Sequence, residues 1–247
     1  MIWIIGGTSE SRELVDRIRD LDEFLITSAT EAGREFIDSD NLIVGRMTYE
    51  EMLKFVEDNN ISMIINLAHP YATIVTENAK NVAKEVEVQY IRYIRKKTAE
   101  NFKGIHLNNY KEAYYIANLN GNIFFTTGSK NIGDFERVKG ENRFIYRILP
   151  AMESIEICRK YNVEMKNIVA LLGPFSKECN KTMFKEYKAD YVVMKDSGNR
   201  GGTLEKLQAC EELNILPIII GRNEEEGIDN LQEIEKIIRR HYNGEFL

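Results

Sequence analysis

The chain has 247 residues, enough for one large domain or two small ones. Hydrophobic residues make up 43% and charged residues 29%, which is the composition of a globular protein that can fill a core. The net charge of −6 argues against a nucleic-acid partner, because such proteins usually carry a basic stripe. It does not argue against an anionic small molecule, since local charge rather than net charge shapes a cleft.

The sequence also predicts a protein without membrane spans or metal sites. No run approaches the roughly 18 apolar residues of a transmembrane helix, and the chain begins with a short apolar strand rather than a signal peptide. Cys158, Cys179 and Cys210 lack the spacing of metal ligands, and their odd number fits a reducing compartment. We therefore expect a cytoplasmic protein, monomeric or homodimeric, in which the cysteines serve as small hydrophobic residues.

Short apolar runs rich in β-branched residues alternate along the chain with longer amphipathic stretches, which predicts an α/β protein built from βα units on parallel sheets. In chain order we expect strands at residues 2–5, 24–27, 63–67, 88–94, 123–126, 143–149, 168–172, 191–195 and 216–220. Helices are expected at residues 9–19, 49–58, 72–85, 111–119, 152–161, 177–188, 204–213 and 231–242. Thr48 and Glu51 have the spacing of a capping box at the start of the second helix.

The alternation of strands and helices predicts two domains, and we place an approximate boundary between them near Pro150. Residues 1–150 are expected to form an N-terminal, Rossmann-like, dinucleotide-binding domain. Residues 151–247 are expected to form a smaller α/β domain that contributes to a substrate cleft. Ligands of open parallel sheets bind beyond the carboxyl ends of the strands, so the residues that follow each strand are the candidates for function.

Two glycines follow the first strand. They let the backbone approach a phosphate closely, and the next helix offers free N–H groups and the positive end of its dipole. The full GxGxxG pattern is absent, because Ser11 stands where a third glycine would pack, so a plain tight turn is the alternative. The cofactor contacts predicted here are Gly6, Gly7, Thr8, Ser9 and Glu10.

The second strand ends in small hydroxyl residues, whereas many NAD-binding folds place an acidic side chain there. Ser28 is predicted to contact the cofactor. Arg34, slightly further on, can accept a 2′-phosphate, which favours NADP; a solvated loop arginine is the alternative.

His69 and Tyr71 follow the third strand, on either side of Pro70. A histidine at this position can contact a cofactor or act as an acid, so His69 joins the predicted cofactor contacts. The alternative is a structural histidine, which is the commoner role of a lone one.

Basic residues follow the fourth strand. Arg92 and the run at residues 95–97 can form a rim for carboxylates. For Lys96 and Lys97 a solvated strand edge is the preferred explanation.

A polar segment follows the fifth strand. Hydroxyl groups, a glycine and a lysine together suit contact with a phosphate or carboxylate, although the spacing is not that of a P-loop. We predict cofactor contacts from Thr127, Gly128, Ser129 and Lys130.

Two segments of the second half follow strands and open helices. The first is Gly173-Pro174-Phe175. The second, residues 195–202, carries three glycines around Arg200 and resembles a mobile anion-binding loop, with flexible turns that bind no ligand as the alternative.

Taken in order, these segments resemble the precorrin-6A reductase family, which includes the cobalt-precorrin-6A reductases. The matching pieces run over nearly the whole chain: GGTSESREL at residues 6–14, NLAHPYA at 66–72, YIRYIRK at 90–96, FFTTGSKNIGDF at 124–135, YRILP at 146–150, LLGPFSKECN at 171–180 and VMKDSGNRGGTLEKLQA at 193–209. Two departures are visible, because the family often has an aspartate where Asn66 stands and an asparagine where Asp196 stands. Asp196 puts a direct contact of that residue with a carboxylate in doubt.

The resemblance implies two Rossmann-like halves with a cleft between them, and hydride transfer from NADPH or NADH to a polycarboxylate tetrapyrrole. It also implies a proton added at the neighbouring carbon, for which His69, Tyr71 and water are candidates. A polycarboxylate needs several cations around it. The residues predicted to bind it are Arg92, Arg147, Gly173, Pro174, Phe175, Lys195, Ser197, Gly198, Arg200, Gly201, Gly202 and Lys206.

Two other functions compete with this one. A different NAD(P)H-dependent reductase would use the same glycine loops. A non-catalytic, dinucleotide-sensing regulatory module would explain the first half equally well, but it leaves the basic, glycine-rich strand ends of the second half unexplained.

Overall fold

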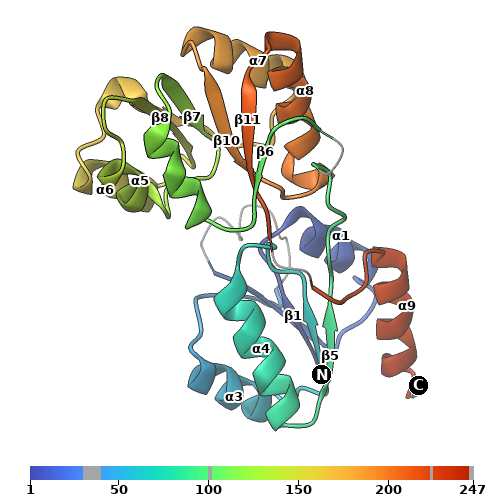
Figure 1. The fold of residues 1–247 in the computed structure, drawn as a ribbon. Helices are drawn as coiled ribbons and strands as arrows, with labels where there is room; N and C mark the ends of the chain where they lie inside the picture. Colours follow the sequence, from blue (N-terminus) through green and yellow to red (C-terminus); the bar gives the residue numbers. More distant parts are fainter. Residues whose placement is uncertain (30–39, 100–101, 223–224, 245–247) are drawn as a thin grey trace. The chain divides into compact units, whose positions relative to one another are not determined.

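The computed structural model describes residues 1–29, 40–99, 102–222 and 225–244 (Figure 1). The chain divides into two compact units. Unit 1 comprises Met1–Arg95 and Glu224–Leu247, and unit 2 comprises Lys96–Asn223. Each unit is built around one parallel sheet flanked by helices, which confirms the expected α/β class with two Rossmann-like halves.

Unit 1 holds a parallel sheet with the strand order β3-β2-β1-β4-β5 over the described residues. Its strands are β1 (Ile2–Ile5), β2 (Phe24–Ser28), β3 (Leu42–Val44), β4 (Met63–Asn66) and β5 (Gln89–Arg92). Its helices are α1 (Ser9–Arg17), α3 (Tyr49–Asp58), α4 (Thr73–Glu85) and α9 (Leu231–Tyr242).

Alternate residues of β1 enter two different cores in unit 1. Ile2 and Ile4 pack with residues of α1 and α9 on one face of the sheet, whereas Trp3 and Ile5 pack with residues of α3 and α4 on the other (Figure 1). Because both faces of the sheet are covered, the sequence of the strand is apolar throughout and does not alternate between apolar and polar residues.

Unit 2 holds a parallel sheet with the order β6-β11-β10-β7-β8-β9. Its strands are β6 (Ile105–Leu107), β7 (Asn122–Phe125), β8 (Arg143–Ile148), β9 (Ile168–Ala170), β10 (Tyr191–Lys195) and β11 (Leu216–Ile220). Its α-helices are α5 (Ile132–Arg137), α6 (Met152–Lys160), α7 (Lys177–Glu186) and α8 (Thr203–Leu213).

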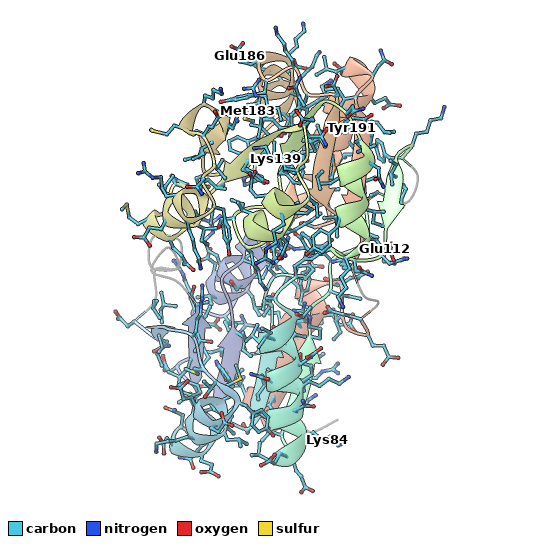
Figure 2. The ribbon with its side chains drawn as sticks, turned by 60° about the vertical axis from the view of Figure 1, so that its left-hand side comes forward. Lys84, Glu112, Lys139, Met183, Glu186 and Tyr191 are labelled. Carbon is cyan, nitrogen blue, oxygen red and sulfur yellow. The ribbon has the colours of Figure 1, made fainter. Side chains whose placement is uncertain are left out.

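The two faces of the second sheet are filled differently. On one face, Met183 of α7, which is labelled in Figure 2, belongs to a cluster with Val192 and Met194 of β10. On the other, Phe125 contacts the rings of Phe135 and Tyr146 with centroids 4.6 and 4.8 Å apart. Aromatic pairs at such distances contribute beyond the area they bury, so both faces hold β7 and its neighbours in place.

The boundary expected near Pro150 is corrected by the structure, because the chain divides at Arg95/Lys96 and again at Asn223/Glu224. The strand before Pro150, β8, pairs with β7 and β9 inside the second sheet. The C-terminal helix α9 returns to unit 1, where Leu231, Ile234 and Ile238 join the core. The order of elements in the sequence does not show with which unit α9 packs, because its apolar stripe is the one that any packed helix has.

Most expected elements are present within two residues of their predicted ends. The capping box of Thr48 and Glu51 is confirmed, with reciprocal hydrogen bonds of 3.3 and 2.7 Å. Two three-residue edge strands, β3 and β6, and the short helix α5 were not predicted, and the helix expected at 111–119 is a 3₁₀ helix, Glu112–Asn118. Within the described residues, no helix has both the length and the apolar character needed to cross a bilayer.

Candidate functional site

The first sheet reverses its winding between β1 and β4, which are adjacent although two strands intervene in sequence. In open α/β sheets such a switch point is where ligands bind, beyond the carboxyl ends of the strands. The glycine loop (Gly6–Ser11) follows β1, and the segment Leu67–Tyr71 follows β4. Thr8 Oγ1 donates a 3.0 Å hydrogen bond to the Leu67 carbonyl, so the two segments are in contact at this edge.

The glycine loop has the conformation that a phosphate cradle requires. Gly7 has φ +95°, which L side chains rarely adopt, and a Cβ there would have no neighbour closer than Ser28 Oγ at 3.7 Å. Thr8 caps α1 through a reciprocal pair of hydrogen bonds with Ser11. The open space at Gly7 and the amino end of α1 therefore suit an anion, and Ser28, a predicted cofactor contact, lies beside this space.

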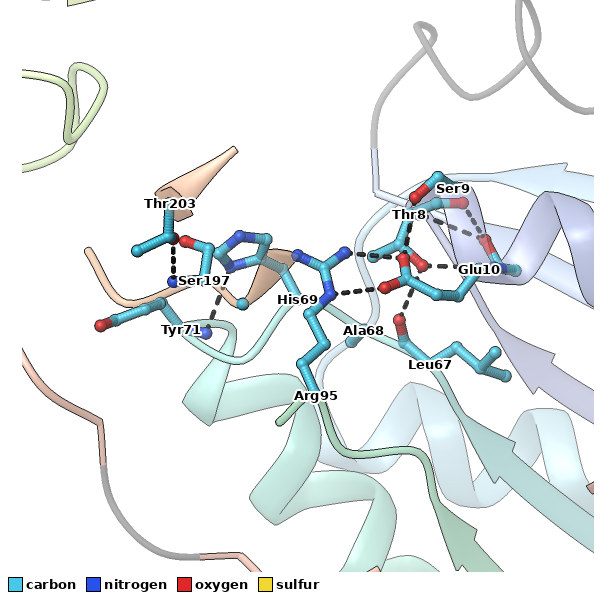
Figure 3. Close-up of polar contacts among 12 residues, drawn as sticks. Thr8, Ser9, Glu10, Leu67, Ala68, His69, Tyr71, Arg95, Ser197 and Thr203 are labelled. Atoms are coloured by element: carbon cyan, nitrogen blue, oxygen red, sulfur yellow. Dashed lines mark hydrogen bonds and ion pairs between the residues drawn. The ribbon is translucent and has the colours of Figure 1, made fainter. Parts of the chain in front are cut away.

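The Glu10 side chain is turned into the protein. It is 1% exposed and forms a bidentate ion pair with Arg95, at 2.6 and 2.7 Å (Figure 3). Burial raises the pKa of Glu10, but the hydrogen bonds and charge of Arg95 outweigh burial and leave it below its ordinary value. The Glu10 carboxylate is therefore engaged with Arg95, and the contact of Glu10 with a cofactor stays a prediction for its backbone. Arg95 neutralises a negative charge that would otherwise repel a phosphate at the loop.

His69 and Tyr71 are both half-buried and lie close together after β4. The Tyr71 backbone N–H donates a 3.3 Å hydrogen bond to His69 Nδ1 (Figure 3). Because Nδ1 accepts this bond, the neutral imidazole carries its proton on Nε2, which makes Nε2 a hydrogen-bond donor.

Arg92 is not available to a substrate carboxylate. It is 5% exposed, and it donates to the carbonyls of Asn66 and Ala68 at 3.3 and 2.8 Å and pairs with Glu225 at 3.0 Å. The expected substrate contact by Arg92 is therefore corrected: this arginine fastens β5 to the end of β4. The Asn66 amide is equally committed, since it accepts from Ala68 N and donates to the Tyr90 hydroxyl, both at 2.9 Å.

Arg34, expected near a 2′-phosphate, lies outside the described residues.

The second sheet has a switch point of its own between β7 and β10. Thr127–Lys130 follows β7, and the loop Asp196–Gly202 follows β10, so two predicted segments meet at one edge of unit 2. Burial is the main cause that lowers the pKa of Lys195, and the nearby charge of Lys130 acts in the same direction. The predicted cofactor contacts therefore lie in both units. Those of the glycine loop, Ser28 and His69 are in unit 1, whereas Thr127–Lys130 are in unit 2, beside residues predicted to bind the substrate.

Asp196 shapes the glycine-rich loop rather than facing an anion. Its carboxylate is 4% exposed and accepts backbone N–H groups of Thr98, Ala99 and Gly198 at 3.2–3.3 Å. The negative charge of Asp196 is therefore compensated by backbone N–H groups and does not face the ligand. Gly202, with φ +67°, is the N-cap residue of α8, and a Cβ built on it would lie 3.4 Å from Pro174 Cβ.

Three cations gather behind this loop and form what we term the cation cluster: Arg147 of β8, Lys195 of β10 and Lys206 of α8. Burial, together with the charges of Arg147 and Lys195, lowers the pKa of Lys206 to about 7. Burial likewise lowers the pKa of Lys195 to about 8 and of Arg147 to about 10. Within the described part of the chain, neither Lys206 nor Arg147 has a salt bridge. Burying a cation is costly, so this cluster is suited to bind carboxylates or phosphates.

Sequence reasoning missed Arg95 and the backbone-binding role of Asp196. Arg95 was grouped with its basic neighbours at 95–97, and no pattern in the sequence links it to Glu10, 85 positions earlier. The Asp-Ser-Gly order after β10 is typical of a turn in which an aspartate binds nearby N–H groups, and it could have identified Asp196.

Comparison with known proteins gives a consistent result. Residues 1–240 match the family described as Precorrin-6x reductase CbiJ/CobK. The cobalt-precorrin-6A reductase of Methanococcus maripaludis is 35% identical over 247 residues, covering 96% of each chain. That of Priestia megaterium is 32% identical over 233 residues, covering 90% of each. A solved structure of CobK precorrin-6A reductase superimposes with a TM-score of 0.81 at 19% identity, over 97% of this chain and 96% of that one, and so shares the fold.

Proposed function

The chain belongs to the precorrin-6x reductase CbiJ/CobK family, and from this premise we propose that it reduces cobalt-precorrin-6A to cobalt-precorrin-6B. It is an oxidoreductase of cobalamin biosynthesis that acts on the tetrapyrrole macrocycle. The cobalt-containing substrate is preferred because the relatives from Methanococcus and Priestia both carry cobalt in their names.

The cofactor of this family is a nicotinamide dinucleotide, and unit 1 fits its pyrophosphate. Gly7 leaves open space at a positive φ, and α1 begins at Ser9 with its N-terminus beside that space. When bound, the dinucleotide supplies the hydride. We propose NADPH rather than NADH, because β2 ends in Thr27 and Ser28 and lacks the acidic residue that holds an unmodified ribose.

We place the substrate on unit 2 because that unit contains the cation cluster. A tetrapyrrole with several carboxylates supplies negative charges that complement Arg147, Lys195 and Lys206. Binding there places carboxylates near the buried Lys206 and fixes the orientation of the ring, which is the protein's main contribution to hydride transfer. His69 and Tyr71 are the proposed sources of the added proton, in competition with water.

The test is an anaerobic assay of the purified protein with cobalt-precorrin-6A and with metal-free precorrin-6A, each with NADPH and NADH. Loss of nicotinamide absorbance together with a two-hydrogen gain in the mass of the macrocycle is the expected result. The Lys195→Ala variant should raise the KM for the macrocycle and leave dinucleotide binding unchanged.

Absence of turnover with every pair, despite dinucleotide binding, would refute the proposed reaction. A change of oligomeric state on a sizing column when dinucleotide is added would then favour the sensing module. The proposed cytoplasmic location rests on the cysteine pattern of the sequence.

A further inference from the structure

Four large apolar side chains are exposed at the carboxyl ends of β8 and β9. They form what we term the apolar patch: Leu149, Met152, Leu171 and Leu172, exposed by 52, 74, 43 and 52%. Isolated exposed leucines are ordinary on protein surfaces, but a contiguous group marks a binding surface.

The register of the sheet places Leu149 and Leu171 side by side. Ile148 lies opposite Ala170 in the β8–β9 pair, and Leu171 N donates a 3.0 Å hydrogen bond to the Ile148 carbonyl. Leu149 and Leu171 therefore leave the sheet from neighbouring strands. Met152 begins α6 three residues beyond Leu149, and Leu172 continues the chain beyond Leu171.

The apolar patch borders the cation cluster. Arg147 lies two residues before Leu149 on β8, and its guanidinium stacks on the Phe175 ring with a centroid distance of 4.6 Å. Phe175 follows the exposed segment Leu171–Pro174 directly. One edge of the second sheet therefore offers an exposed apolar surface next to the cation cluster.

We infer that the apolar patch receives one face of the tetrapyrrole ring while the cation cluster binds carboxylates at the rim of that ring. The inference rests on the proposed function and deepens it. A tetrapyrrole is a wide ring with apolar faces and acidic side chains at its edge, so its chemistry matches an apolar surface bordered by cations. A second copy of the chain fits less well, because a two-fold contact through the apolar patch would bring the bordering cations toward their own equivalents.

The test compares the double variant Leu171→Ser/Leu172→Ser with the control Met165→Ser. Met165 is 77% exposed and precedes β9 at the opposite, amino end of that strand, so it matches the patch in exposure but not in place. Because all three side chains are exposed, the substitutions leave the core intact. Met152→Gln serves as an independent second variant.

Three quantities are measured for each protein: the KM for cobalt-precorrin-6A, the dissociation constant for uroporphyrin as an octacarboxylate ring probe, and the dissociation constant for NADPH. In the double variant, the KM for cobalt-precorrin-6A and the dissociation constant for uroporphyrin should each rise about tenfold, because the ring no longer covers two leucines. Binding of NADPH, and of butane-1,2,3,4-tetracarboxylate as a small polyanion without a ring, should be unchanged. The control should behave as the unaltered protein.

Unchanged KM and uroporphyrin affinity in the double variant would overturn the inference. So would an unaltered protein that is dimeric and becomes monomeric on substitution of the two leucines, because the patch would then be an interface between copies. If the unaltered protein binds uroporphyrin through the patch but reduces no precorrin, the proposed function fails while the ring-binding surface stands.

Discussion

Replacement of Lys206 by methionine should make the protein more stable and less active. Lys206 is 5% exposed and lies near the charges of Arg147 and Lys195. Methionine has a similar length and no charge, so it fills the same space without the cost of burying a cation. Stability and substrate binding are therefore expected to change in opposite directions, as is common for residues retained for function.

The size of the gain depends on pH. The pKa of Lys206 falls from its ordinary 10.5 to about 7 in the folded protein. In an unfolded chain the lysine binds its proton more tightly, so the penalty on folding is largest below pH 7 and disappears as the pH rises through 10.5. At about 1.4 kcal/mol per pH unit the limiting penalty is roughly 5 kcal/mol. Because rearrangement and water entry reduce it, we expect Lys206→Met to stabilise by about 2–4 kcal/mol at pH 7 and under ~1 kcal/mol at pH 10.

The measurement is urea unfolding followed by far-UV circular dichroism between pH 6 and pH 10, with the exposed Lys185→Met as control. The control should leave stability within about 0.5 kcal/mol of the unaltered protein at every pH. Uroporphyrin affinity should fall at least about tenfold in Lys206→Met, as expected when a buried charge partner is lost. A variant less stable than the unaltered protein at pH 7, or a gain that does not shrink toward pH 10, would refute the reasoning.

Three further outcomes follow from the two switch points. Gly7→Val should abolish dinucleotide binding, measured by nicotinamide fluorescence, because φ +95° strains a β-branched residue; retained binding would place the pyrophosphate elsewhere. Arg95→Ala should cost about 3 kcal/mol at pH 7, measured through the single tryptophan, Trp3, because Glu10 stays buried without its partner. Since the pKa of Glu10 is lowered, this cost should shrink as the pH falls below 4.5, and a cost independent of pH would contradict the ion-pair explanation. Asp196→Asn should lower stability by about 1–2 kcal/mol, because one carboxylate oxygen becomes an N–H donor facing backbone donors; an unchanged unfolding midpoint would show that those bonds contribute little.

The sequence by itself determined the α/β class and most of the strands and helices. Runs such as Ile2–Ile5 are apolar throughout because parallel strands are buried on both faces, and that signal is local. The glycine loop after β1 and the basic loop after β10 could be located for the same reason, since each follows its strand directly. The short edge strands β3 and β6 have only one neighbour each in their sheets, so their patterns were too weak to predict.

Tertiary structure alone decided which charged residues are free to bind a ligand. Arg92 and Lys206 both occupy predicted ligand positions, but Arg92 is held by Ala68 and Glu225, whereas Lys206 has no salt bridge among the described residues. That difference arises from pairing between residues up to 133 positions apart. The division of the chain at Arg95, and the return of α9 to unit 1, likewise depend on which surfaces bury each other, and no local pattern encodes that choice.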